Sequence, residues 1–135
     1  MTGETSLSTL IRSMAPELIA GEFVFLTFPD ARYGDHPELQ PIACFQEPEG
    51  LTLVVPRDLA NQHDLPYDAV FRAITLTVLS SLEAIGLTAT FATALAEQGI
   101  SANVFAGFHH DHILVGKADA ERAVTALQEL AGNSG

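Results

Sequence analysis

The fold of this chain is decided by residues 71–104, which read FRAITLTVLSSLEAIGLTATFATALAEQGISANV. Apolar residues alternate with polar or small ones over residues 71–78, as they do in a half-buried strand. A turn region follows at residues 80–86, and residues 87–98 then carry an apolar face at helical spacing, with Gly99 as a C-terminal stop. A second strand begins near Ala102. The segment therefore predicts a strand, a loop, a helix and a strand in succession.

The same signals extend the pattern in both directions. Upstream, we expect a helix over residues 7–14, ended by Pro16, a strand over 22–28, a hairpin of 41–46 and 51–55 around the turn 47–50, and a short helix over 57–63. Downstream, we expect strands over 102–108 and 112–115 and a final helix over 118–130. The predicted order is α-β-β-β-α followed by β-α-β-β-α.

This order is typical of an α+β sandwich of ferredoxin-like character, in which helices cover one face of an antiparallel sheet. We expect two tightly packed units, residues 1–69 and residues 70–135, because two independent cores of this size would be marginal. Each half shows one strand fewer than a complete unit needs. The halves are therefore expected to share strands, or a central strand near residues 70–78 serves both.

The composition limits the classes of partner. Six basic against seventeen acidic side chains leave a formal net charge of −11, which repels nucleic acid and anionic membranes and favours a cationic or zwitterionic ligand. The first residues lack the basic and apolar regions of a signal peptide, and no stretch is apolar enough to span a bilayer. We therefore expect a cytoplasmic protein with no nucleic-acid or membrane partner.

The loop after the strand at 71–78 carries a family resemblance. Glu83 and Gly86 end the loop, a helix follows, and Gly99, Ile100 and Asn103 open the next strand. This arrangement resembles the ACT-domain pattern, although Ile85 stands where many ACT domains have proline. The resemblance is clearest over residues 70–130 and implies an ACT-type sandwich, with two ACT-like units sharing an antiparallel sheet packed against helices.

Three segments resemble a narrower group. Residues 47–54, EPEGLTLV, residues 80–87, SSLEAIGL, and residues 110–113, HDHI, are similar to a bacterial family of uncharacterised paired-ACT proteins related to cytosolic arginine sensors. The resemblance implies a regulatory or sensor module that binds a small molecule, an amino acid, at an interface between ACT units. It also implies a homodimer or higher homo-oligomer, and no enzymatic activity.

The candidate ligand site is the loop at 80–87 together with Asn103. Amide groups at a helix start can bind a ligand carboxylate, glycine allows close approach of the backbone, and an asparagine amide both donates and accepts hydrogen bonds. Alternatively, Gly86 only makes the turn and Asn103 only pairs with backbone. The expected ligand-binding residues are Ser80, Ser81, Leu82, Glu83, Ile85, Gly86, Leu87 and Asn103.

A histidine cluster at residues 109–112 offers an alternative function. Strand alternation would place His110 and His112 on one face, where two imidazoles and the Asp111 carboxylate could bind a divalent metal. Polar residues are also what an exposed hairpin turn requires, and the sequence identifies no further ligand. We assign no metal ligand and no cofactor, but a metal-dependent enzyme stays open as an alternative, as does a purely structural oligomerisation module.

Nucleophilic catalysis has little support in the sequence. Ser80 and Ser81 lie in no G-x-S-x-G elbow, and no phosphate-binding or dinucleotide fingerprint is present. The single cysteine, Cys44, lies in the apolar run PIACF at 41–45, which predicts a buried thiol. We therefore assign no catalytic residue.

Overall fold

Two groups of residues form separate compact units. The computed structural model describes residues 7–77 and 86–133. Unit 1 comprises Met1–Ala20 with Arg72–Gly135, and unit 2 comprises Gly21–Phe71. Among the described residues, no helix has the length and apolar character needed to cross a bilayer. Each unit has its own core of buried apolar side chains.

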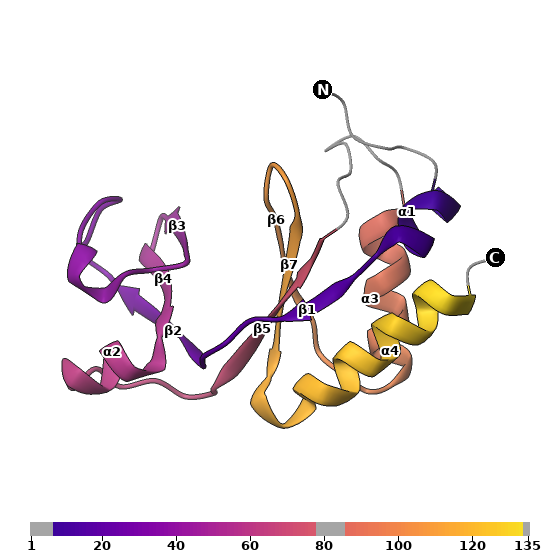
Figure 1. The fold of residues 1–135 in the computed structure, drawn as a ribbon. Coiled ribbons are helices and arrows are strands. Elements are labelled where there is room, and N and C mark those ends of the chain that lie inside the picture. The colour runs from indigo at the N-terminus through magenta and orange to yellow at the C-terminus, as the bar shows by residue number, and fades with distance from the viewer. Residues whose placement is uncertain (1–6, 78–85, 134–135) are drawn as a thin grey trace. The chain divides into compact units, whose positions relative to one another are not determined.

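Unit 1 contains a sheet with strand order β1-β5-β7-β6 and three α-helices. The helices α1, α3 and α4 lie together on one side of β6 and β7 (Figure 1). Its elements are α1 (Leu7–Ser13), β1 (Pro16–Leu18), β5 (Phe71–Leu76), α3 (Leu87–Glu97), β6 (Asn103–Ala106), β7 (Asp111–Gly116), the 3₁₀ turn η2 (Lys117–Asp119) and α4 (Ala120–Asn133). Phe71, the first residue of β5, belongs to unit 2.

The core of unit 1 joins the helices to one face of this sheet. Phe91 of α3 and Leu127 of α4 have no exposed surface, and they belong to one cluster with Ile74 of β5 and Ile113 of β7. Leu10 and Ile11 of α1 are in the same cluster. Burying apolar stripes of this kind is the main source of stability for short helices, which are marginal in water.

β1 is a strand that the sequence did not predict. Leu18 pairs with Ile74 in an antiparallel ladder with β5, and Ile19 donates its backbone N–H to the carbonyl of Ala73 at 2.8 Å. Three residues starting at a proline carry too little periodicity to be recognised. With β1, the described part of unit 1 has four strands and two helices besides α1, which is the ferredoxin-like set.

Unit 2 is a sheet of order β3-β4-β2 with one short helix. Leu26 of β2 pairs with Leu53 of β4, and Cys44 of β3 pairs with Leu53 on the other side, all antiparallel. On the side of β2 that faces away from β4, Phe23 pairs with Phe71. The elements are β2 (Phe23–Phe28), the 3₁₀ turn η1 (Pro37–Leu39), β3 (Ala43–Glu47), β4 (Gly50–Pro56) and α2 (Arg57–Gln62).

The hairpin between β3 and β4 depends on a glycine. Gly50 has φ +147°, and a Cβ added there would lie 2.6 Å from Cα of Pro29 and 2.7 Å from the carbonyl oxygen of Phe28. No L side chain fits that contact without movement of backbone. The absence of a side chain at Gly50 therefore lets the end of β2 lie against the turn.

The prediction of a buried Cys44 was wrong. Cys44 is exposed, as are Phe45, Gln46 and Glu47, because β3 pairs only with β4 among the described strands and forms an edge of the unit 2 sheet. An apolar local sequence indicated burial, but burial depends on what covers the strand. Phe45 and Ile42 are 71% and 51% exposed at this edge.

The predicted α+β fold is confirmed, and most helices and strands lie within a few residues of their expected bounds. The two compact units do not coincide with the two consecutive halves, residues 1–69 and residues 70–135. Residues 1–20 pack with residues 72–135, because α1 contributes to the unit 1 core and β1 pairs with β5.

Candidate functional site

The candidate ligand site is described in part. Ser80, Ser81, Leu82, Glu83 and Ile85 lie outside the described residues. The structure places Gly86, Leu87 and Asn103, all in unit 1.

Gly86 is the N-cap of α3 and has φ +91°. Its carbonyl oxygen accepts hydrogen bonds from N–H of Thr90 at 2.9 Å and from Oγ1 of Thr90 at 2.7 Å. A glycine has no side chain with which to cap the first-turn amides, and no other described side chain caps them. Thr88 and Ala89 are exposed. Among the described residues, therefore, no side-chain acceptor meets the positive end of the α3 dipole, which attracts anionic groups.

Leu87 is a core residue of unit 1. It is 4% exposed and belongs to the same cluster as Phe91 of the same helix. Only its backbone N–H, at the first position of α3, is suited to ligand contact. α1 also approaches this helix start, because a Cβ on Gly86 would lie 3.4 Å from Cδ2 of Leu7.

Asn103 begins β6 and is bound to the neighbouring strand. Its Nδ2 donates to the carbonyl oxygen of Leu114 in β7 at 3.3 Å, and the two residues are ladder partners. This contact is the backbone pairing expected if Asn103 has only a structural role. The amide oxygen Oδ1 has no partner among the described residues, so it can still accept a hydrogen bond.

The histidine cluster is arranged around the start of β7. His112 Nδ1 lies 3.0 Å from Oγ1 of Thr75, while Nδ1 of His110 is buried without a hydrogen-bond partner among the described residues. Asp111 is 8% exposed, and burial raises its pKa against the opposing attraction of His112 and His110. Within residues 7–77 and 86–133, no three histidine, cysteine or acidic side chains are placed to hold a metal ion.

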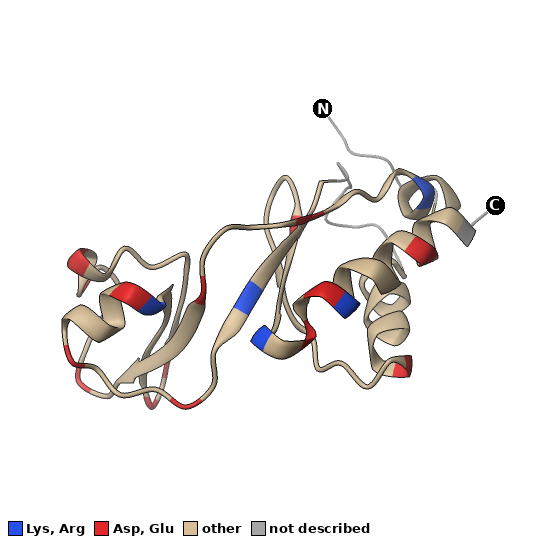
Figure 2. Ribbon diagram, turned by 60° about the horizontal axis from the view of Figure 1, so that its bottom comes forward, with Lys and Arg blue, Asp and Glu red and all other residues tan. Residues whose placement is uncertain are grey.

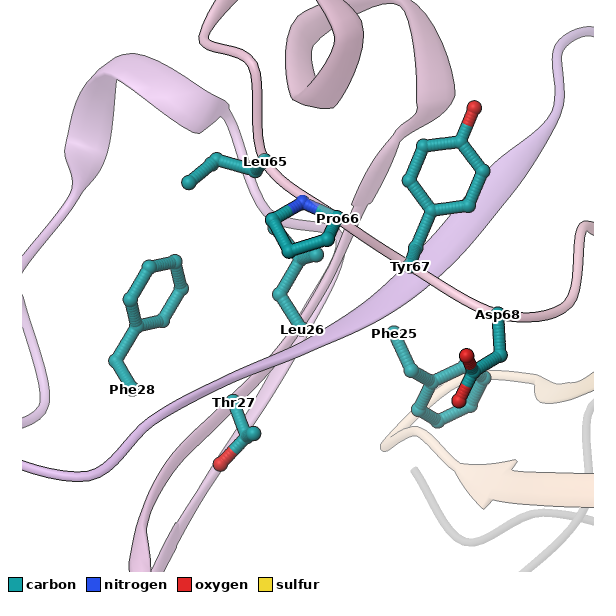
Figure 3. Close-up of a pocket in the computed structure, with 8 residues that line it drawn as sticks. All are labelled: Phe25, Leu26, Thr27, Phe28, Leu65, Pro66, Tyr67 and Asp68. Carbon is teal, nitrogen blue, oxygen red and sulfur yellow. The ribbon is translucent and has the colours of Figure 1, made fainter.

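A second hollow lies in unit 2, between β2 and the segment after α2. It has a volume of about 350 Å³, which is within the range of small-molecule sites. Figure 3 shows that the two lining segments run in opposite directions, so that Phe28 lies near Leu65 at one end and Phe25 near Asp68 at the other. Leu26, Thr27, Pro66 and Tyr67 complete the lining.

The sequence did not identify this pocket. Residues 23–28 predicted a buried strand, and residues 64–66 predicted only the end of a helix. The two segments are separated by more than thirty residues and meet only through the fold. No local motif marks such a pocket in a single sequence.

Comparisons with known proteins agree with this fold. Two family models, both of the ACT domain, match residues 2–72 and residues 69–129. A crystal structure of a protein of unknown function from Vibrio cholerae, described as a possible transport protein, is 55% identical with a TM-score of 0.85, over 94% of this chain and 97% of that one. No curated protein matches the chain.

More distant structures share the fold alone. A protein from Agrobacterium tumefaciens is 19% identical with a TM-score of 0.65, over 87% of this chain and 89% of that one. The ligand-free regulatory subunit of aspartate kinase from Thermus thermophilus is 11% identical with a TM-score of 0.63, over 85% and 95% of the two chains. The matched family models cover nearly all of the sequence. The chain therefore belongs to the ACT-domain family.

Proposed function

We propose that this protein is a regulatory module that binds a free amino acid at the start of α3. ACT domains are regulatory units, and two ACT models together span residues 2–129. The fold is also that of the regulatory subunit of aspartate kinase from Thermus thermophilus. Catalysis is not part of the proposal, and among the described residues no three histidine, cysteine or acidic side chains are placed to hold a metal ion.

The observation that carries the proposal is the uncapped start of α3. Gly86 leaves the first-turn N–H groups without a side-chain acceptor among the described residues, and a ligand α-carboxylate fits that role. The backbone at Gly86 has a left-handed conformation that glycine adopts without strain. The carboxylate would accept hydrogen bonds from these amides and would also be stabilised by the helix dipole.

Asn103 is also proposed to contact a ligand, through the acceptor of its amide group. Its Nδ2 is held by Leu114, which fixes the plane of the amide, and its Oδ1 is available. Ala102 and Val104, on either side of Asn103, pack against the core cluster that contains Leu87. The Oδ1 acceptor can bind a ligand N–H group.

We also propose that the protein acts as a homodimer or higher homo-oligomer. β3 has an unpaired edge, and Phe45 and Ile42 are exposed beside it. An edge of this kind pairs readily with a strand of another chain. Tighter binding of the amino acid to one assembly state would shift the population toward that state.

Calorimetric titration with each of the twenty amino acids, after a thermal-shift screen, tests the proposal. The variant is Gly86→Ala and the matched control is Gly99→Ala, at the opposite end of α3. Both positions have positive φ, +91° and +73°, so both variants pay a similar backbone cost of about 1 kcal/mol. Only Gly86→Ala alters the helix start.

The expected result is saturable binding of at least one amino acid, weakened about tenfold or more by Gly86→Ala and little changed by Gly99→Ala. Asn103→Leu should weaken binding as well, while an amide of the same acid without its carboxylate should fail to bind. If none of the amino acids binds at millimolar concentration, the proposed function is wrong. Equal losses in the two glycine variants would refute the site.

A further inference from the structure

We propose that the pocket between β2 and residues 65–68 binds a small organic cation, an ammonium group attached to an apolar body. The pocket belongs to unit 2 and shares no residue with the proposed amino-acid site in unit 1. The inference therefore goes beyond the regulatory function proposed above and stands independently of it.

The wall formed by residues 65–68 is held in place by α2. The hydroxyl of Tyr67 accepts a hydrogen bond from Nε of Arg57 at 2.9 Å and donates one to Oδ1 of Asn61 at 2.8 Å. Leu65 donates its backbone N–H to the carbonyl of Ala60 at 2.9 Å. In Figure 3 the Tyr67 hydroxyl points away from the strand residues. A wall fixed in advance reduces the entropy that a ligand must lose on binding.

One end of the pocket is apolar. Phe28 extends toward Leu65 and Pro66 in Figure 3, and Leu26 points toward Pro66 from the strand below. The side-chain carbon atoms of Phe28, Leu65 and Pro66 neither donate nor accept hydrogen bonds. This end suits a hydrocarbon or aromatic group, whose transfer from water is favourable.

The other end carries a carboxylate. Asp68 lies beside Phe25 at that end, is exposed, and has no hydrogen-bond or ion-pair partner among the described residues. A carboxylate at the rim attracts an ammonium group, and the face of a phenyl ring adds to the attraction of a cation. The polar end of the ligand is therefore expected to be positive.

The backbone of β2 supplies a further acceptor. In an antiparallel ladder, successive residues of a strand form their hydrogen bonds alternately toward one side and toward the other. The N–H of Arg57 bonds to the carbonyl of Glu22, so residues 24, 26 and 28 of β2 bond toward β4. The N–H and C=O of Thr27 then point to the opposite side, where residues 65–68 lie. The Thr27 carbonyl can accept a second hydrogen bond from an ammonium group.

The charge of unit 2 favours the same ligand. Residues 21–71 contain two arginines and no lysine, against nine acidic residues. Acidic segments clearly outnumber basic ones in this part of Figure 2. Arg57 is paired with Glu22 at 2.7 Å, so it does not neutralise Asp68. The resulting negative potential raises the local concentration of cations and disfavours anions.

The probe for this site is 2-phenylethylammonium, which carries one ammonium group on an aromatic body. Its binding to the full chain is measured by calorimetry and by ¹H–¹⁵N chemical-shift mapping. 3-Phenylpropionate, with a similar body and the opposite charge, is the ligand control. The variant is Asp68→Asn, and the matched control is Asp64→Asn, because Asp64 is an exposed aspartate of the same segment whose φ of +53° asparagine tolerates.

We expect saturable millimolar or tighter binding of 2-phenylethylammonium, with shift changes confined to residues 25–28 and 65–68, and no binding of 3-phenylpropionate. Asp68→Asn should weaken binding by about tenfold, and Asp64→Asn by less than about twofold. Equal effects of the two variants, equal binding of the two ligands, or no saturation would overturn the proposal. Because the probe has no carboxylate, its failure leaves amino-acid binding at α3 untouched.

Discussion

Arg57 Nε donates a hydrogen bond to the hydroxyl of Tyr67 at 2.9 Å, while its Nη1 lies 2.7 Å from Oε1 of Glu22. These contacts raise the pKa of the Arg57 guanidinium, and the bond to Tyr67 is the larger cause. Arg57 thereby links the start of β2 to the segment after α2.

Replacing Tyr67 by phenylalanine removes the hydroxyl and keeps the ring. We expect Tyr67→Phe to lower the free energy of unfolding by about 1–2 kcal/mol, because the hydroxyl makes two hydrogen bonds, from Arg57 and to Asn61. Affinity for 2-phenylethylammonium should fall several-fold, since the pocket wall loses its attachment. Urea denaturation measures the first effect and calorimetry the second. Unchanged stability would show that the Arg57–Tyr67–Asn61 contacts do not hold the segment.

The contact between Gly50 and residues 28–29 predicts that a methyl group added at Gly50 destabilises the fold strongly. Gly50→Ala combines a positive φ with backbone atoms at 2.6 and 2.7 Å from the added Cβ. We expect it to lower the free energy of unfolding by about 2–4 kcal/mol. Gly34 has φ +98° with no atom within 4 Å, so Gly34→Ala should lose only about 1 kcal/mol. Denaturant midpoints of the two variants compare these values. Equal losses would contradict a steric role for the Gly50 contact.

Asp111 predicts a specific pH dependence. Burial raises the pKa of its carboxyl, so the folded state holds the proton more tightly than the unfolded state does. This contribution favours folding at pH values below the unfolded pKa and is lost as the pH rises through the folded pKa. Asp111→Asn should therefore be more stable than the native protein at pH 7.

The advantage of Asp111→Asn should shrink toward zero below about pH 4, where the native carboxyl is protonated in both states. Chemical denaturation at several pH values gives the comparison. A variant less stable than the native protein at pH 7 would mean that the Asp111 carboxylate makes favourable contacts that outweigh its burial.

The exposure of Cys44 predicts a reactive thiol. At dilutions where the chain is monomeric, the protein should react with one equivalent of a disulfide reagent such as Ellman's reagent, at a rate close to that of the denatured chain. Cys44→Ser should abolish the reaction and leave stability nearly unchanged, because the side chain fills no core. Slow reaction that denaturant accelerates strongly would indicate that the β3 edge is covered in solution, as assembly through that edge would require.

Much of the fold followed from local patterns. The helix over residues 87–98 and the hairpin around residues 47–50 were predicted within a residue or two, because periodicity and turn residues are properties of short segments. β1 was missed, since its three residues form a strand only where β5 lies beside them. For the site, the sequence indicated Gly86 and Asn103 through family resemblance, and their hydrogen bonds came from the structure.

The sequence by itself determined the order of helices and strands, the excess negative charge and the ACT resemblance, because these depend on residue type and spacing along the chain. Only the tertiary structure decided that residues 1–20 pack with 72–135, that Cys44 is exposed on an edge strand, and that Phe25–Phe28 meet Leu65–Asp68 around a pocket. Burial and pocket formation depend on which distant segments come together. That information resides in the packing of the whole chain and not in any local stretch of it.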